Sequence, residues 1–413
     1  MADSIKSPPG ISAQSVLSGV LNLGRGYVKR LSSGDLGALP ILIGLIIMTV
    51  VFQTQNGNFL TPRNVVNLIL QMAGTTMIAY GMVFVLLLGE IDLSVGYVSA
   101  VGGVTVAMLL SDSRTGWTWY TAIPLALLIT AGIGLLQGLI IALFRVPSFI
   151  VTLAGLLAWN GVVLRLVGRG GTVIIQDPLV IGIANSYLAP HTGWGWLVVG
   201  VFVSGYAVTQ GVQYLTRRTR NLSTRPLPVI IVQTLLIGGI GVGVVAVCNQ
   251  DRGLPMVGVL LLVMGVLLTL LAKNTRFGRF VYAVGGNAEA ARRAGINVNR
   301  IRVTVFVLAS TLAGLGGIIL ASRLRSVDTR AGSGNLLLNV VAAAVIGGTS
   351  LFGGRGRVTS AILGALIISS LENGMGLLNV EAGDKFIITG IVLLLAVIID
   401  SLSRRRQQQS GLA

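Results

Sequence analysis

The stretch NVVNLILQMAGTTMIAYGMVFVLLL (residues 64–88) is an apolar run that contains no charged residue. A helix needs about 20 such residues to cross the hydrocarbon core of a bilayer. Arg63 precedes the run, and Gly89 and Glu90 follow it. The stretch therefore predicts a transmembrane helix, and the rest of the chain repeats its pattern.

The composition places most of the chain in a membrane. Of its 413 residues, 53% are hydrophobic and only 10% are charged, and the mean hydropathy is +0.85. Soluble domains carry roughly 25% charged residues. The net charge of +17 comes from basic residues scattered between apolar runs. That distribution fits the positive-inside rule and not a nucleic-acid groove, so we expect contact with membrane lipid and no nucleic acid.

Similar apolar runs recur along the sequence and define the predicted fold. They lie at residues 38–55, 64–88, 95–111, 119–144, 147–167, 194–215, 229–248, 255–272, 303–322, 336–350, 358–376 and 385–400. We predict an all-α membrane protein, a polytopic helical bundle of about twelve transmembrane helices. An N-terminal segment (1–37) precedes the transmembrane domain (38–402), and a tail (403–413) follows it. Glycine-rich residues 347–356 leave open whether one segment re-enters the membrane.

The distribution of basic residues predicts the orientation. With the N-terminus inside, 21 of the 30 basic residues fall in inner segments. This is the excess that the positive-inside rule requires. No apolar stretch lies early enough to be a cleaved signal peptide. We therefore expect a multi-pass protein of the cell (plasma or inner) membrane with both termini in the cytoplasm.

Several kinds of chemistry are excluded by the sequence. None of the four lysines, Lys6, Lys29, Lys273 and Lys385, stands in a Gly-Lys-Ser/Thr motif, so the chain has no P-loop for ATP. The single cysteine, Cys248, and the single histidine, His191, offer no metal-ligand cluster. No G-x-S-x-G nucleophile motif is present. The sequence thus favours a conduit over an enzyme, and it predicts no metal site and no catalytic residue.

A short polar helix is predicted at residues 287–296, inside the inner loop 273–302. Asn287 is a good N-cap, and Glu289 lies in the first turn, where the positive helix end favours an acid. Arg292 and Arg293 occupy the last turn, and Gly295 lies where helices end in the left-handed conformation. Such a helix is too short to be stable alone, so packing must support it. The local pattern leaves open whether it is a linker or a docking element.

Acidic residues near apolar runs have two interpretations. Glu90 and Asp92 follow the 64–88 run, and a carboxylate inside a membrane is a candidate functional group. Alternatively the break lies at the inner surface, and Asp92 caps the next helix through the amides of residues 94 and 95. The second interpretation is favoured here. Glu372 and Asn373 are likewise expected to form a polar helix end rather than a substrate ligand.

Three segments in combination resemble the permease subunits of ATP-binding-cassette sugar importers, the ribose, galactose, arabinose and xylose group. They are FLTPRN (59–64), IDLSVG (91–96) and FGRFVYAVGGNAEAARRAGINV (277–298), and IGGTSLFGG (346–354) agrees with them. The motif residues are Ile91, Asp92, Leu93, Ser94, Gly96, Gly347, Gly348, Gly353 and Gly354. The resemblance covers residues 38–402. Usual members have ten spans, and two extra apolar runs before residue 287 resemble the longer xylose branch.

The resemblance implies a role for the short helix and for several partners. In such importers a cytoplasmic helix of the permease docks in a cleft of a separate ATPase, which binds ATP and Mg²⁺. Here Glu289, Ala290, Ala291 and Gly295 match that pattern, and Arg292 and Arg293 flank it. The chain itself would bind no cofactor. It would pair with a second copy and receive D-xylose, or a related pentose, from an extracytoplasmic sugar-binding protein.

Two further residue sets are predicted on this basis. Uncharged hydrogen-bonding and aromatic side chains suit a sugar pathway, or alternatively join helices to one another. The pathway candidates are Asn67, Gln71, Tyr80 and Asn160. Three outer arginines suit acidic knobs of a binding protein, or alternatively lipid headgroups and the neighbouring Asp328. They are Arg323, Arg325 and Arg330.

Two rival functions remain at this point. An ion-coupled secondary sugar transporter would need an ion site, for which Glu90 and Asp92 are the available pair. A membrane-embedded glycosyl- or lipid-processing enzyme would need convergent outer carboxylates. The outer acids Asp112, Asp177, Asp251 and Asp328 lie on different loops. An importer permease for ribose, a nucleoside or another small polar solute is also compatible with the sequence.

Overall fold

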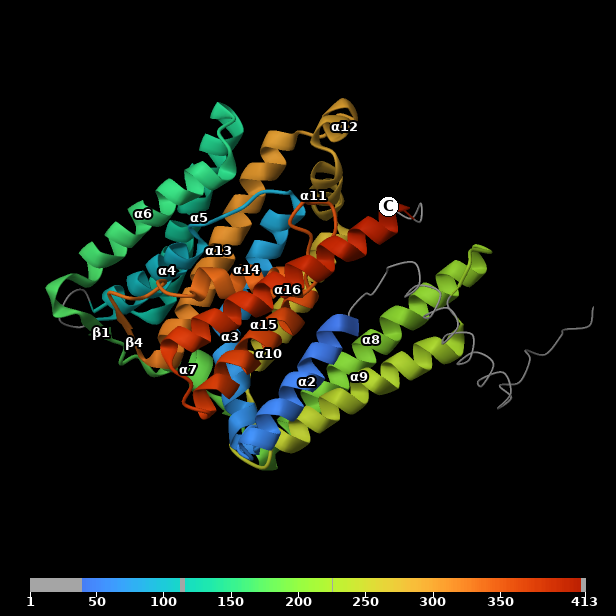
Figure 1. Cartoon of the computed structure of the whole chain (residues 1–413), viewed down its shortest axis with the longest axis horizontal. Helices are drawn as coiled ribbons and strands as arrows, with labels where there is room; N and C mark the ends of the chain where they lie inside the picture. The colour runs from blue at the N-terminus through green and yellow to red at the C-terminus, as the bar shows by residue number, and fades with distance from the viewer. Residues whose placement is uncertain (1–38, 112–115, 225, 410–413) are drawn as a thin grey trace, which may run out of the picture.

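The computed structural model describes residues 39–111, 116–224 and 226–409. The predicted N-terminal segment 1–37 and residues 410–413 of the predicted tail lie outside these residues. The described chain is an α-helical bundle with two short β-pairs, so the predicted fold class is confirmed (Figure 1). Each apolar run of the sequence corresponds to one helix.

The helices that correspond to the apolar runs are α2 (Leu39–Gln55), α3 (Pro62–Leu87), α4 (Val95–Leu110), α5 (Trp119–Phe144), α6 (Ser148–Val167), α8 (Trp194–Thr219), α9 (Leu227–Cys248), α10 (Met256–Asn274), α13 (Val298–Leu324), α14 (Leu336–Ile346), α15 (Ser360–Leu377) and α16 (Ala382–Gln409). Within the described ranges, eight helices are long and apolar enough to cross a membrane. Shorter apolar helices at Ile41–Gln55, Val95–Leu110 and Leu336–Ile346 add to them. The number of spans stays a prediction.

Helix α3 forms the centre of the bundle. All of its residues from Met72 to Leu87 are buried, because α13, α14, α15 and α10 pack around it. Small residues allow the helices to pack this closely. At Gly317 of α13, an added methyl group would overlap the carbonyl oxygen of Ser99 in α4. Glycine is therefore required there by the approach of two helix backbones.

Two of the apolar helices are short and begin inside the bundle. Helices α4 and α14 have 16 and 11 residues, fewer than the roughly 20 that a full span requires. Their first turns lie next to each other. A methyl group on Gly96 would lie 2.8 Å from the carbonyl oxygen of Gly332 and 3.8 Å from the amide of Leu337. The segments 88–94 and 325–335, which lead into them, are irregular apart from the strand β4 (Ser326–Asp328).

The two ends of the bundle differ in character. At one end, β1 (Thr172–Ile174) pairs antiparallel with β4, and β2 (Tyr187–Leu188) pairs with β3 (Leu254–Pro255). We call this the β end. A helix not expected from the sequence, α7 (Pro178–Asn185), follows β1 and is capped by Asp177, whose Oδ1 accepts from the amide of Leu179 at 2.9 Å. The other end contains α11 (Arg276–Gly286) and α12 (Ala288–Arg293), and we call it the α12 end.

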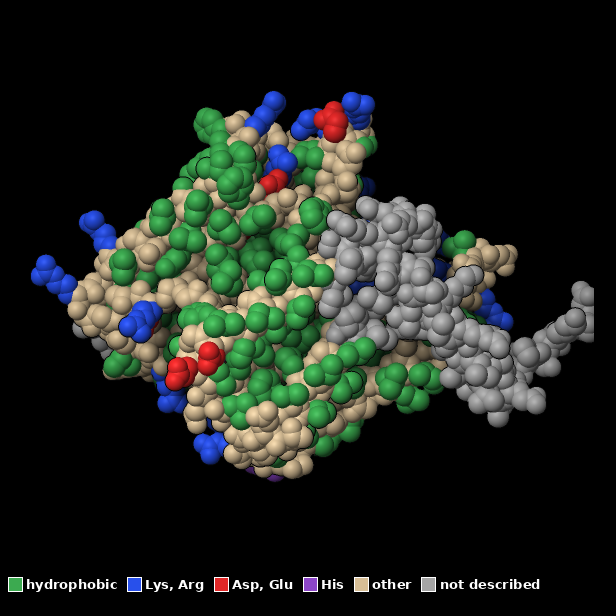
Figure 2. Space-filling view, viewed as in Figure 1, with side chains coloured by type: hydrophobic (Ala, Val, Ile, Leu, Met, Phe, Trp, Pro, Cys, Tyr) green, Lys and Arg blue, Asp and Glu red, His purple; other side chains and the backbone are tan. Residues whose placement is uncertain are grey.

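The α8–α9 hairpin, which corresponds to the two extra apolar runs, extends away from the rest of the bundle (Figure 1). Most of its side chains are exposed, and α9 contacts α3. Hydrophobic side chains also cover much of the broad face in Figure 2, with the visible charged side chains mainly near its edges. A surface of this kind suits lipid and not water.

Candidate coupling site and pathway residues

The short polar helix of the sequence analysis exists as α12, Ala288–Arg293. Asn287 is its N-cap, because its Oδ1 accepts from the amide of Ala290 at 2.9 Å. Gly295 has φ +84°, as the predicted helix stop requires. Glu289 forms ion pairs with Arg292 at 3.0 Å and with Arg293 at 3.4 Å. These exposed pairs add little stability, so they leave the charged groups available for exchange with a partner.

Helix α12 protrudes from the bundle, and acidic and basic side chains gather over it (Figures 1 and 2). Glu289, Ala290, Arg292 and Arg293 are exposed, whereas Ala291 is only 5% exposed. Of the two alanines, only Ala290 is therefore open to a partner, and Ala291 anchors the helix. An open groove of about 350 Å³ lies beside α12 and is lined by Arg145, Arg292, Gly295, Ile296, Asn297, Val298 and Asn299.

Asp92 caps α4, as the sequence indicated. Its Oδ1 accepts from the amide of Ser94 at 2.8 Å and from the Ser94 hydroxyl at 2.7 Å. Asp92 is only 1% exposed, so it is enclosed by the protein, and its expected position at the inner surface of the membrane stays a prediction. Gln137 of α5 donates to the Ser94 hydroxyl at 2.9 Å and joins this network. The IDLSVG motif thus encodes the start of a half-length helix inside the bundle.

Glu90 has a different partner. Its Oε1 lies 2.9 Å from Nε of Arg302 near the start of α13, and both side chains are largely shielded from solvent. The pair connects the irregular segment 88–94 to the helix that directly follows α12. This pairing was not predicted from the sequence, because 212 positions separate the two residues along the chain.

Three of the four pathway candidates, Asn67, Gln71 and Tyr80, lie on α3, and Asn160 lies on α6. Three of them bond to other helices or turns: Arg252 donates to Asn67 at 3.0 Å, Asn373 donates to Gln71 at 3.2 Å, and Tyr80 donates to the Leu261 carbonyl at 2.9 Å. Asn160 is half-buried on α6. Tyr80 is fully buried, which suits the alternative that it joins helices. Their role in a pathway stays a prediction.

A polar cluster between α3, α14 and α15 was not expected. Neither Glu372 nor Asn373 caps the end of α15. Asn339 of α14 donates to Glu372 Oε1 at 2.6 Å, and Asn373 exchanges hydrogen bonds with Asn64 of α3. Asn339 Oδ1 is buried and has no protein partner. A polar side chain inside an apolar bundle requires hydrogen-bond partners. The positions of such residues along their helices are the signal by which the sequence could have indicated this cluster.

The three candidate binding-protein arginines lie at the β end. Arg325 and Arg330 are exposed, and Arg323 is half-buried. Arg325 has φ +55°, and its carbonyl oxygen accepts from the amide of Ile175 at 2.9 Å. The amide of Arg330 donates to Asp328 Oδ1 at 2.9 Å. The backbone is thus fixed at these positions, and the side chains of Arg325 and Arg330 extend into open space.

A helical bundle with half-length helices, apolar outer faces and a protruding polar helix is the architecture of a multi-pass membrane protein. The chain belongs to the family described as branched-chain amino acid transport system / permease component, whose family model matches residues 64–397. It is therefore a transport subunit and not an enzyme. The family confirms the resemblance to importer permeases.

The chain is similar to curated relatives over most of its length. It is 38% identical over 391 residues to the xylose transport system permease protein XylH of Escherichia coli K12, covering 92% of this chain and 96% of that protein. The corresponding protein of Haemophilus influenzae is 36% identical and is covered to 99%. The ribose import permease protein RbsC of Bacillus subtilis is 32% identical, with 89% of this chain and 94% of that protein covered. No solved structure matches the chain.

Proposed function

We propose that this chain is the permease subunit of an ATP-driven importer of D-xylose or a related pentose. The names of its relatives support a sugar, since they include xylose and ribose permeases that it matches over most of its length. Ribose or another small polar solute remains the alternative substrate within the same class. ATP and Mg²⁺ bind to a separate ATPase, and this chain supplies the pathway and its coupling.

The observation that carries the proposal is the exposed, capped helix α12. A six-residue helix is not stable alone, so its protrusion requires the support of Ala291 and the Asn287 cap. The ATPase docks on Glu289, Ala290, Arg292 and Arg293, and the neighbouring arginine-lined groove accepts acidic groups of the same partner. The α12 end then faces the cytoplasm, as do both termini, and the β end faces the sugar-binding protein.

The complete transporter contains two copies of this chain, two ATPase chains and one binding protein. The two copies together enclose the pathway, for which Asn67, Gln71, Tyr80 and Asn160 are the proposed residues; Tyr80, which is fully buried, would act by holding α3 against α10. The ion-coupled alternative is weaker, because Glu90 is paired with Arg302 and Asp92 caps α4. Uptake that survives loss of ATP and collapses with the proton gradient would favour that alternative.

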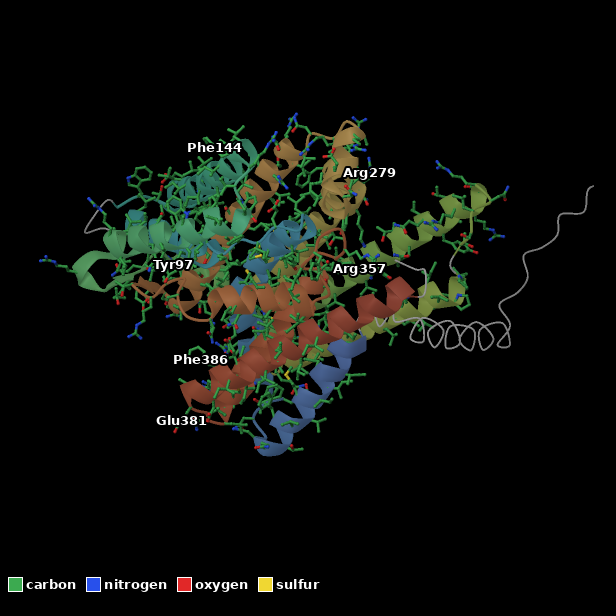
Figure 3. All side chains as sticks on the ribbon, turned by 45° about the horizontal axis from the view of Figure 1, so that its top comes forward. Tyr97, Phe144, Arg279, Arg357, Glu381 and Phe386 are labelled. Atoms are coloured by element: carbon green, nitrogen blue, oxygen red, sulfur yellow. The ribbon has the colours of Figure 1, made fainter. Side chains whose placement is uncertain are left out.

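The test is a membrane pull-down of the full chain in mild detergent, comparing the parent with Glu289→Arg and Ala290→Trp. Glu289→Arg reverses one charge of the docking face, and Ala290→Trp adds bulk to it. The matched control is Glu381→Arg, because Glu381 lies far from Arg279 of the α12 end (Figure 3). We expect the ATPase with the parent and the control and its loss with both α12 variants. An ATPase retained equally by all four chains would remove α12 as the docking site, and its absence from the parent would overturn the importer assignment.

A further inference from the structure

Three backbone segments that are distant in the sequence meet at the α12 end. The amide of Gly354 donates to the carbonyl oxygen of Leu87 at 2.9 Å. A methyl group on Gly285 would overlap this same carbonyl oxygen and would lie 2.8 Å from the amide of Gly354. A methyl group on Gly353 would lie 3.0 Å from the amide of Gly89. We define Leu87, Gly89, Gly285, Gly353 and Gly354 as the glycine junction.

Each segment of the junction leads to an element of the transport machinery. Gly285 lies two residues before Asn287, the cap of α12. Leu87 is the last residue of α3, Gly89 lies in the irregular segment 88–94 that leads to α4, and Gly353 and Gly354 lie in the loop between α14 and α15. The base of the docking helix is therefore in direct backbone contact with the connections of both half-length helices.

Two side-chain contacts reinforce the junction. The Tyr282 hydroxyl of α11 donates to the carbonyl oxygen of Gly356 at 2.8 Å. Burial raises the pKa of Tyr282 above its ordinary range, so the hydroxyl keeps its proton and remains a donor. Glu90 and Arg302 form the second contact, which joins segment 88–94 to α13. Displacement of α11 and α12 is thus resisted by contacts to both half-helix connections.

Contacts of this kind transmit displacement well. A close-packed interior has little free volume, and glycine backbones have no side chains whose rotamers absorb a shift. The segments 88–94 and 347–359 are irregular, so they bend more readily than the helices that they join. A push on α12 would therefore first shift the two connections 88–94 and 347–359, to which the start of α4 and the end of α14 are attached.

We propose that the glycine junction is the mechanical link through which closure of the ATPase on α12 moves both half-length helices, with Gly285, Gly354 and Tyr282 as positioning residues. The proposal rests on the importer function proposed above. It identifies the contacts through which ATP hydrolysis changes the conformation of the pathway. It requires that transport per ATP hydrolysed depends on the fit of Gly285 against Leu87 and Gly354.

The test compares Gly285→Ala with Gly286→Ala in the complete transporter reconstituted in liposomes. The two glycines are adjacent in α11, but a methyl group on Gly286 meets no atom within 4 Å. Co-purification of the ATPase, binding-protein-stimulated ATP hydrolysis and xylose uptake are measured for each. For Gly285→Ala we expect retained ATPase binding and about a tenfold fall in sugar imported per ATP. Gly286→Ala should match the parent.

A second variant keeps the test decisive if Gly285→Ala does not assemble. Tyr282→Phe removes only the hydrogen bond to Gly356, and Tyr206→Phe on the α8–α9 hairpin is its control. We expect Tyr282→Phe to assemble and to import about threefold to tenfold less sugar per ATP. If Tyr282→Phe, or a Gly285→Ala transporter that assembles, imports as much sugar per ATP as the parent, the proposed role of the glycine junction is wrong. A parent chain without ATP-dependent uptake would instead overturn the importer function.

Discussion

Asn64 of α3 and Asn373 of α15 form a reciprocal amide pair inside the bundle. The Asn64 amide donates to Asn373 Oδ1 at 2.8 Å, and the Asn373 amide donates to Asn64 Oδ1 at 3.0 Å. Both side chains are buried, with 8% of each residue exposed. Water cannot replace a lost partner easily at such a site, so the pair fixes α15 against the central helix.

Replacing one member of this pair should destabilise the protein. Asn373→Leu removes both hydrogen bonds of the pair, and Asn64 keeps only its bond to the Phe59 carbonyl oxygen. The polar atoms left without a partner cost about 1–3 kcal/mol of unfolding free energy. Thermal unfolding of the purified chain in detergent measures the loss. The double variant Asn64→Leu with Asn373→Leu should lose less than the sum of the single variants. The pairing would be contradicted if the double variant lost as much stability as the two single variants together. It would also be contradicted if Asn373→Leu lost no more stability than Gln213→Leu on exposed α8.

Arg252 is expected to fix the α8–α9 hairpin at the β end. Its guanidinium donates to Tyr187, Asn67 and Asp251 and lies 4.8 Å from the centre of the Tyr187 ring. Cys248, the single cysteine, is buried four residues earlier. Arg252→Ala should loosen this end and speed the reaction of Cys248 with a maleimide, because local opening exposes the thiol.

The control for this experiment is Arg220→Ala at the opposite end of the hairpin. Arg220 is exposed, and it lies next to the end of α8. Its removal should leave the labelling rate of Cys248 at the parent value. Equal rates for the parent and Arg252→Ala would show that the three hydrogen bonds of Arg252 do not control the hairpin.

The contact between α4 and α13 gives a packing prediction. Gly317→Ala places a methyl group against the Ser99 carbonyl oxygen, and overpacking of this kind costs about 1–3 kcal/mol. Gly132→Ala in α5 is the matched control, because a methyl group there meets no atom within 4 Å. Thermal unfolding in detergent should therefore separate the two variants. If Gly317→Ala and Gly132→Ala unfold at the same midpoint temperature, α4 and α13 have room to separate.

Local signals made the elements and the docking helix predictable. The apolar run 64–88 predicted α3 (Pro62–Leu87), and the residues Asn287, Glu289 and Gly295 predicted α12, because caps and stops act within one helical turn. The glycine junction could not be predicted in this way. Gly285 looks like any helix glycine in the sequence, and its requirement comes from Leu87 and Gly354, which are far from it along the chain.

The pathway shows the same limit. Asn67 and Gln71 were identified as polar residues in an apolar run, but their partners Arg252 and Asn373 come from other parts of the chain. Asp92 was correctly predicted as a cap, since its acceptor role toward Ser94 is local. Its burial depends on the surrounding helices, including α5, which supplies Gln137. Chemistry within one turn is therefore readable from the sequence, and depth in the bundle is not.

Arg325 and Arg330 at the β end are the proposed contacts of the sugar-binding protein. Arg325→Glu and Arg330→Glu should each weaken the stimulation of ATP hydrolysis by the binding protein, because acidic groups of that partner would then meet a like charge. Arg325 already has φ +55°, and glutamate is no more strained there than arginine, so folding is unaffected. Raised salt should weaken stimulation of the parent and have less effect on the variants. Reconstituted transporter titrated with binding protein measures this, with Arg220→Glu as a control away from the β end. Full stimulation of both variants would assign these arginines to lipid headgroups instead.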